Sequence, residues 1–263
     1  MGHPSAGAPE HLFLAELLQK HGITSAIFSL DYTLSHNATF PKQRDEALAA
    51  YDWLREDLGV DNGRIVVIGD SAGGHLILSF LVGLHERELV SNLQLRERAE
   101  KPAAAVLISP WVNLHTSHSR FLELHWEERL FKLSLDTWCS LLFQDTSKDI
   151  VNVYGNLALS HPDRGSWVDI LPQYTWVSAG SEELAFRYDI EDFVNIAKQD
   201  GANIVLEIEQ GKDHSWQCAE AFRQHGLLLD MAVDVDDQAV MQGYRHIAEV
   251  MLRLYKTGMR VLN

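Results

Sequence analysis

The sequence contains only two cysteines, Cys139 and Cys218, among its 263 residues. Two cysteines cannot form a disulfide framework, and their scarcity favours a reducing compartment. No apolar run approaches the ~20 residues that are needed to cross a bilayer, and the opening residues MGHPSAG do not resemble a secretory signal. From these absences we expect a cytoplasmic protein without a membrane span.

Basic residues are also in short supply. The chain has 22 lysines and arginines against 37 acidic residues, which gives a formal net charge of −15. A field of this sign repels phosphate backbones and anionic membrane surfaces. We therefore expect no nucleic-acid partner, and a small neutral or hydrophobic molecule is the kind of ligand that fits best.

Short apolar runs alternate with segments of helical periodicity along the chain. This alternation predicts a mainly parallel sheet of about five strands flanked by helices, the α/β class, within a single domain over residues 1–263. The predicted strands are residues 25–30, 64–69, 103–109, 173–179 and 202–208. The predicted helices are residues 10–21, 42–58, 72–85, 189–199 and 239–256.

Two blocks interrupt this alternation. Residues 111–172 are rich in aromatic side chains and lack an obvious strand. They form either a helical excursion with its own small core or a cap over the carboxyl ends of the strands, where open α/β sheets bind ligands; we favour the cap. The second block, residues 226–241, contains the apolar run LLLDMAV, which the sequence assigns equally to the core, a pocket wall or a subunit contact.

The segment Gly69-Asp70-Ser71-Ala72-Gly73 satisfies G-x-S-x-G between a predicted strand and a predicted helix. A sharp turn of this kind holds a serine hydroxyl out at the top of the sheet, and its small neighbours let a substrate and a histidine approach. It also directs the backbone N–H of Ala72 toward a developing oxyanion. We interpret Ser71 as a nucleophile; the alternative is a purely structural turn.

The longer string GDSAGGHL, residues 69–76, resembles the hormone-sensitive-lipase-like branch of the α/β-hydrolases. Further elements agree with this branch, namely the Asp-Tyr pair at residues 31–32, the Phe-Pro pair at 40–41 and the SPWV element at 109–112. The branch contains carboxylesterases and sterol-ester acetyl hydrolases. The resemblance implies a catalytic triad and no cofactor.

The resemblance also implies the partners of Ser71. His214, in the string GKDH after the last predicted strand, stands where the family has its catalytic base. After the fourth strand the family shows an aspartate followed by leucine, and alignment on that leucine puts Glu182 in the role of the acid. Glu183 and Asp189 are the alternatives, while Asp213 is expected to point elsewhere.

Two further groups of residues are candidate binding sites. Three histidines of the 111–172 block suggest a metal site, which we reject because they show no pattern of supporting ligands; they are His115, His118 and His125. The expected substrate-binding residues border the serine turn or follow the third strand; they are Asp70, Gly73 and Trp111.

One family element is missing from the sequence. The family places a strand and an HGGG-type loop before the first helix, and that loop donates further N–H groups to the oxyanion; no His-Gly-Gly run occurs here. Three explanations stay open: a truncated form of a longer enzyme, which we favour, a sheet in which residues 25–30 pair directly with 64–69, or a gap filled by another chain, in a homo-oligomer or with a completing partner.

The leading functional hypothesis is a serine carboxylesterase that hydrolyses short acyl esters, of the acetyl type, of small hydrophobic alcohols through an acyl-enzyme. Ser71, His214 and Glu182 form its expected triad, with Ala72 as the oxyanion donor. The alternatives are a ligand-binding or non-hydrolytic protein with the same fold, and an inactive subunit.

Overall fold

The computed structural model describes residues 7–90, 101–114, 126–183, 185–230 and 237–257. The sequence leads us to expect one domain, and the contacts group the chain into two compact units. One unit comprises Tyr32–His214, and the other comprises Met1–Asp31 together with Ser215–Asn263. Each unit is described by itself below.

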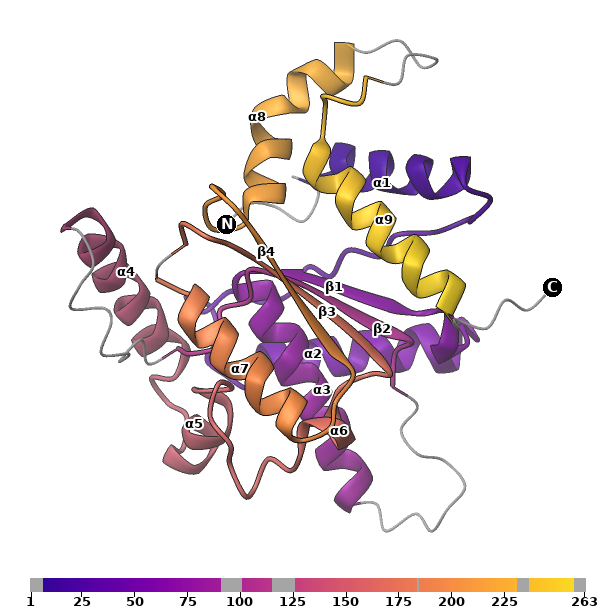
Figure 1. Ribbon diagram of the computed structural model, residues 1–263. Helices are drawn as coiled ribbons and strands as arrows, with labels where there is room; N and C mark the ends of the chain where they lie inside the picture. The colour runs from indigo at the N-terminus through magenta and orange to yellow at the C-terminus, as the bar shows by residue number, and fades with distance from the viewer. Residues whose placement is uncertain (1–6, 91–100, 115–125, 184, 231–236, 258–263) are drawn as a thin grey trace. The chain divides into compact units, whose positions relative to one another are not determined.

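Among its described residues, the larger unit is built on a parallel sheet of four strands in the order β1-β2-β3-β4 (Figure 1). Every residue of β2 is buried, as expected for a strand covered on both faces. The predicted α/β class is confirmed. It follows from apolar runs that are long enough to form buried inner strands. The strands are β1 (Val66–Asp70), β2 (Ala104–Ile108), β3 (Tyr174–Gly180) and β4 (Ile204–Glu209).

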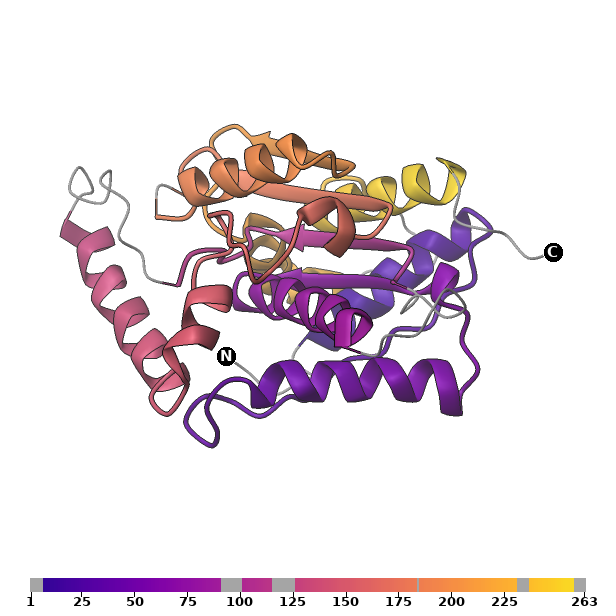
Figure 2. The ribbon, with the colours of Figure 1, turned by 90° about the horizontal axis from the view of Figure 1, so that it is seen from below.

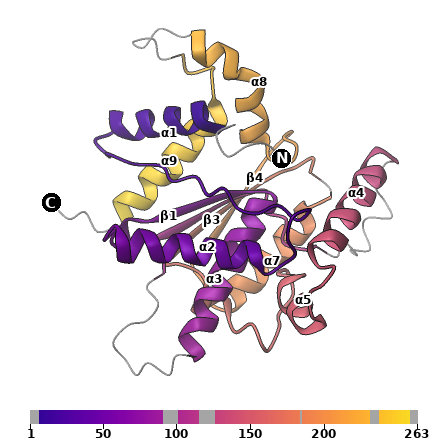
Figure 3. The ribbon, with the colours of Figure 1, turned by 180° about the vertical axis from the view of Figure 1, so that it is seen from behind.

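Helix α3 (Ala72–Val90) packs against β1 and β2, and α7 (Arg187–Gln199) packs against β3 and β4 (Figure 2). Helix α2 packs against α3 (Figure 3). Leu78 and Phe193 are fully or almost fully buried in the core between these helices and the strands. The helices and turns of the larger unit are α2 (Lys42–Asp52), η2 (Trp53–Asp57), η3 (Asn62–Arg64), α3 (Ala72–Val90), α4 (Trp126–Leu142), α5 (Lys148–Tyr154), α6 (Trp167–Ile170) and α7 (Arg187–Gln199).

The predicted strand at residues 25–30 is wrong. This segment forms no strand, and its apolar side chains Ile27 and Phe28 are 44% and 50% exposed. A short apolar run favours a strand, but the strand forms only when its backbone groups find a paired neighbour. Within the described residues β1 has such a neighbour, β2, on one side only.

In the part of the smaller unit that the structure describes, three helices contact one another, α1 (Ala8–Lys20), α8 (Trp216–Asp230) and α9 (Gln242–Thr257). Helix α1 buries Leu14, Leu17 and Leu18, the stripe that its periodicity predicts. The predicted closing helix begins at Gln242, three residues later than expected. Part of the undecided block at 226–241 lies in α8, and its residues 231–236 lie outside the described part of the chain.

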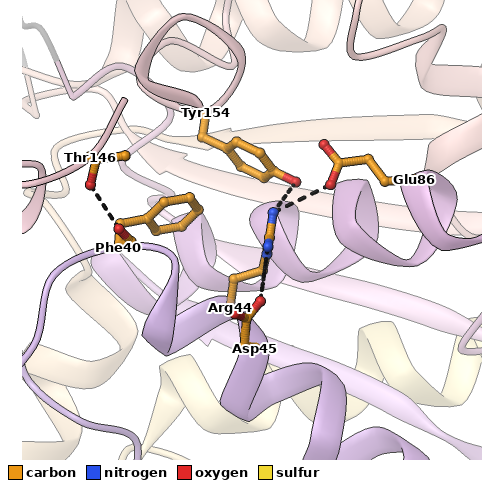
Figure 4. Close-up of polar contacts among 6 residues, drawn as sticks. All are labelled: Phe40, Arg44, Asp45, Glu86, Thr146 and Tyr154. Carbon is orange, nitrogen blue, oxygen red and sulfur yellow. Dashed lines mark hydrogen bonds and ion pairs between the residues drawn. The ribbon is translucent and has the colours of Figure 1, made fainter. Parts of the chain in front are cut away.

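Residues 111–172 leave the sheet after β2 and return to β3, and polar contacts fix this excursion to the rest of its unit (Figure 4). The guanidinium of Arg44 on α2 donates to the hydroxyl of Tyr154 at 2.8 Å and to Glu86 at 3.3 Å. Burial raises the pKa of the Tyr154 phenol, so its oxygen stays neutral. The Thr146 hydroxyl donates to the Phe40 carbonyl at 2.7 Å. The excursion is thereby anchored on α2 and on Phe40, two residues before that helix.

Among the helices of the described residues, none is both long and apolar enough to cross a membrane.

Candidate active site

Ser71 occupies the turn between β1 and α3, and its backbone has the positive φ of 53° that this turn requires. Its N–H donates to the Ile108 carbonyl at 2.9 Å, and its own carbonyl accepts from the Trp111 N–H at 3.0 Å. A Cβ at Gly69 would overlap the Gly73 carbonyl oxygen, so the turn tolerates only glycine there. These bonds fix the serine at the carboxyl end of β1.

His214 follows β4 and reaches the serine. Its Nε2 lies 2.9 Å from the Ser71 hydroxyl oxygen, although 143 residues separate the two in the chain. The loop before His214 runs against the end of β3, because a Cβ at Gly180 would overlap the Lys212 carbonyl oxygen. The Phe186 ring stacks on the imidazole with centroids 4.4 Å apart. Position and ring plane of the histidine are therefore both constrained.

The carboxylate beside His214 belongs to Glu183. Its Oε2 is 3.4 Å from Nδ1 of His214, and its side chain is completely buried. The structure does not bring Glu182 to the histidine: that residue is exposed, and its carboxylate accepts from the neighbouring Ser181 hydroxyl at 2.8 Å. Asp189 is buried in α7, where it accepts from the Asn113 amide at 3.1 Å. Of the acids considered from the sequence, Glu183 is the one that the structure places within 4 Å of the imidazole.

Proton transfer needs the histidine tautomer that these contacts favour. If the Ser71 hydroxyl donates to Nε2 of His214, that nitrogen carries no proton and Nδ1 carries one. A proton on Nδ1 points to the Glu183 side, where the negative charge of a carboxylate stabilises the imidazolium that forms when the serine loses its proton.

The residues expected around the serine lie in different settings. Ala72 begins α3, and the N–H groups of a first helical turn have no acceptor within the helix, so its N–H is available to an oxyanion. A Cβ at Gly73 would have no atom within 4 Å, which leaves space beside the serine. Asp70 is half-buried at the end of β1.

Trp111 lies deeper than expected. The residue is 5% exposed, and its Nε1 donates to the Asn113 carbonyl at 2.8 Å. Its indole and the Phe186 ring form an edge-to-face pair. The indole therefore supports Phe186, which in turn stacks on His214. The sequence points to Trp111 but not to Phe186, since an aromatic residue between a strand and a helix carries no distinguishing pattern.

A second histidine, His75, is buried on α3 one turn after Ser71. Its Nδ1 lies 3.0 Å from the Trp111 carbonyl oxygen. Because a carbonyl oxygen can only accept, Nδ1 is the donor of this hydrogen bond. Burial lowers the pKa of His75 to about 4, against a smaller opposing effect of the hydrogen bond to Trp111. The ring is thus neutral near pH 7 and ties the segment after β2 to the serine turn.

The three histidines rejected as metal ligands, His115, His118 and His125, lie outside the described residues. Within the described part of the chain, no group of three or more His, Cys, Asp or Glu side chains could hold a metal ion.

A parallel sheet that brings a serine, a histidine and a buried carboxylate together at its carboxyl edge defines an α/β protein of the serine–histidine–acid class. Residues 6–218 match the family described as alpha/beta hydrolase fold, and the chain belongs to that family. The resemblance to its hormone-sensitive-lipase-like branch is confirmed by the relatives.

The relatives include esterases and acetyl-hydrolases. Esterase LipU of Mycobacterium tuberculosis is 37% identical over 116 residues, which cover 44% of this chain and 35% of the esterase. An acetyl-hydrolase of Streptomyces hygroscopicus is 27% identical over 82% of this chain and 65% of its own length. The chain thus spans less than two thirds of either relative.

Solved structures show the same fold at lower identity. The crystal structure of EstE5 has a TM-score of 0.70 at 22% identity, over 97% of this chain and 73% of that one. An esterase from the bacterial hormone-sensitive lipase family has a TM-score of 0.69 at 22% identity, over 97% of this chain and 72% of that one.

Proposed function

We propose that this chain is a serine carboxylesterase that acts on short-chain acyl esters of small hydrophobic alcohols. The observation that carries the proposal is the 2.9 Å contact between the Ser71 hydroxyl and Nε2 of His214, with the Glu183 carboxylate on the opposite side of the imidazole. The esterase and acetyl-hydrolase names of the relatives support the reaction type and the short acyl group.

In the first half of the reaction, Ser71 attacks the ester carbonyl carbon while His214 takes the serine proton at Nε2. The carbonyl oxygen becomes an oxyanion, and the N–H of Ala72 donates to it. His214 then gives its proton to the alcohol oxygen as the C–O bond breaks, which leaves an acyl group on Ser71. Glu183, which replaces Glu182 as the proposed acid, stabilises the imidazolium throughout.

In the second half, His214 removes a proton from water as the water oxygen attacks the acyl carbon. Collapse of this second tetrahedral intermediate returns the proton to the Ser71 oxygen and releases the carboxylic acid. The open space at Gly73 supports the approach of both reactants. The excursion at residues 111–172 is our proposed cap over this edge, because it leaves the sheet two residues after Ser109 and is anchored by the contacts of Figure 4.

The test is hydrolysis of p-nitrophenyl acetate together with fluorophosphonate labelling and mass mapping of the labelled residue. We expect the label on Ser71, and we expect Ser71→Ala to abolish both labelling and turnover. Ser140→Ala is the matched control, because Ser140 is exposed on α4 and its hydroxyl only donates to the Asp136 carbonyl. Hydrolysis that survives Ser71→Ala in a folded chain would refute the acyl-enzyme route through Ser71.

A further inference from the structure

Ser109 stands at the carboxyl end of β2 and is completely buried. Its hydroxyl donates to Oε2 of Glu183 at 2.6 Å. This is the same carboxylate oxygen that lies 3.4 Å from Nδ1 of His214. The hydroxyl and the imidazole therefore meet at one atom of the buried acid.

The distance identifies the bond as a strong one. Hydroxyl donors approach an ionised carboxylate to about 2.5–2.7 Å, and such bonds are roughly twice as strong as neutral ones. A glutamate also has one more rotatable bond than an aspartate, so its carboxylate needs more support to keep one orientation. Ser109 supplies that support from a second strand.

The backbone of Ser109 indicates that the hydroxyl is required. Its φ is 41°, a left-handed conformation that strains a residue with a Cβ and that glycine adopts freely. A glycine here would relieve the strain and lose the hydroxyl. The backbone is held in place because the Ser109 N–H donates to the Ser178 carbonyl on β3 at 2.8 Å.

The residue directly before Ser109 contacts the nucleophile. The carbonyl of Ile108, directly before Ser109, accepts the N–H of Ser71 at 2.9 Å. The end of β2 thus contacts the backbone of the serine on one side and the carboxylate of the acid on the other, and it fixes the distance between the two ends of the triad.

We propose that Ser109 is a positioning residue that holds the Glu183 carboxylate against His214. Its contribution to turnover rests on the proposed function, whereas its effect on the orientation of Glu183 does not. A positioning role of this kind acts only through the acid, which gives the proposal a sharp test.

The test is a double-mutant cycle with steady-state kinetics on p-nitrophenyl acetate. We expect Ser109→Ala and Ser109→Gly each to lower kcat by about 10- to 100-fold with little change in KM, as expected for the loss of a hydrogen bond to a charged group. In a Glu183→Gln background the same substitutions should change kcat less than about 2-fold, because the acid through which they act is gone. Equal losses in both backgrounds, or no loss in either, would overturn the proposal.

Two controls separate the hydroxyl from the backbone and from simple burial. The glycine variant removes strain and the alanine variant keeps it, so similar losses in both assign the effect to the hydroxyl. Ser79→Ala removes another fully buried serine hydroxyl, one without a hydrogen-bond partner among the described residues, and should leave kcat unchanged.

A second measurement does not depend on turnover. Proton NMR should show a downfield resonance for the Nδ1 proton of His214 that is absent in Glu183→Gln, shifted upfield in Ser109→Ala and Ser109→Gly, and unchanged in Ser79→Ala. If the wild-type chain hydrolyses no ester but shows this pattern, the positioning role holds and the proposed function fails. A resonance unaffected by both Ser109 substitutions refutes the positioning role whatever the activity.

Discussion

Replacing His75 with asparagine should remove a defined part of the acid sensitivity of this fold. Burial lowers the pKa of His75 from 6.5 to about 4. Between these two pH values the unfolded chain binds a proton at this site and the folded chain does not, so stability falls as the pH falls. Above pH 6.5 neither state is protonated, and below about pH 4 both are, so the loss is confined to this window.

The size of the effect follows from the same two values. Since one pH unit corresponds to about 1.4 kcal/mol, the drop from 6.5 to about 4 costs the wild-type chain about 3 kcal/mol of unfolding free energy. Asparagine does not titrate, and its amide nitrogen can take the place of Nδ1 as donor to the Trp111 carbonyl. The variant is expected to be less stable near pH 7, because the smaller side chain leaves a cavity, and to lose less stability on acidification.

The assay is urea unfolding at half-unit steps from pH 7.5 to pH 4, followed by circular dichroism. Subtracting the variant from the wild type cancels the titration of all other groups, and the difference should slope by up to about 1.4 kcal/mol per pH unit below pH 6.5. Parallel stability curves for the two chains would show that His75 is not held neutral in the fold and would refute the reasoning.

Three further predictions concern the acid, the serine turn and the anchor of the excursion. In p-nitrophenyl acetate assays, Glu183→Gln should lower kcat by about 10⁴-fold, by analogy with triad acids elsewhere. Glu182→Gln changes the exposed neighbouring residue and should leave kcat within about 2-fold. The reverse result would make Glu182 the acid of the triad. Gly69→Ala should lower the melting temperature, because the added Cβ overlaps the Gly73 carbonyl. Gly73→Ala should raise the melting temperature slightly through helix propensity, because no atom lies within 4 Å of its Cβ. Equal shifts in the two variants would contradict this difference between the two glycines. Arg44→Ala should cost about 2–4 kcal/mol in urea unfolding, because it removes the guanidinium that bonds both Tyr154 and Glu86 at a partly buried site. Arg87→Ala breaks an exposed pair with Asp52 and should cost under about 1 kcal/mol in the same assay.

The sequence predicts the inner strands of the sheet because each is an apolar run that must be buried on both faces. It fails at residues 25–30, where the run is equally apolar but the pairing partner is not a property of the run itself. A strand forms only if a partner strand, often distant in the sequence, pairs with its backbone, and local composition does not show whether that partner exists.

The choice of the candidate acid also depends on contacts between distant parts of the chain. Glu182 and Glu183 are adjacent and chemically identical, so motif alignment decides between them by spacing alone. In the structure the backbone N–H of Glu182 donates to the Lys212 carbonyl, and the turn sends the next side chain inward to Ser109 and His214. Which of two neighbours points inward depends on this contact between distant loops, which no local pattern encodes.

The boundary between the two compact units falls directly after His214. The larger unit, residues 32–214, contains all three side chains of the candidate triad, Ser71, Glu183 and His214. The Ser71–His214 and His214–Glu183 distances are therefore set between residues that share one compact unit.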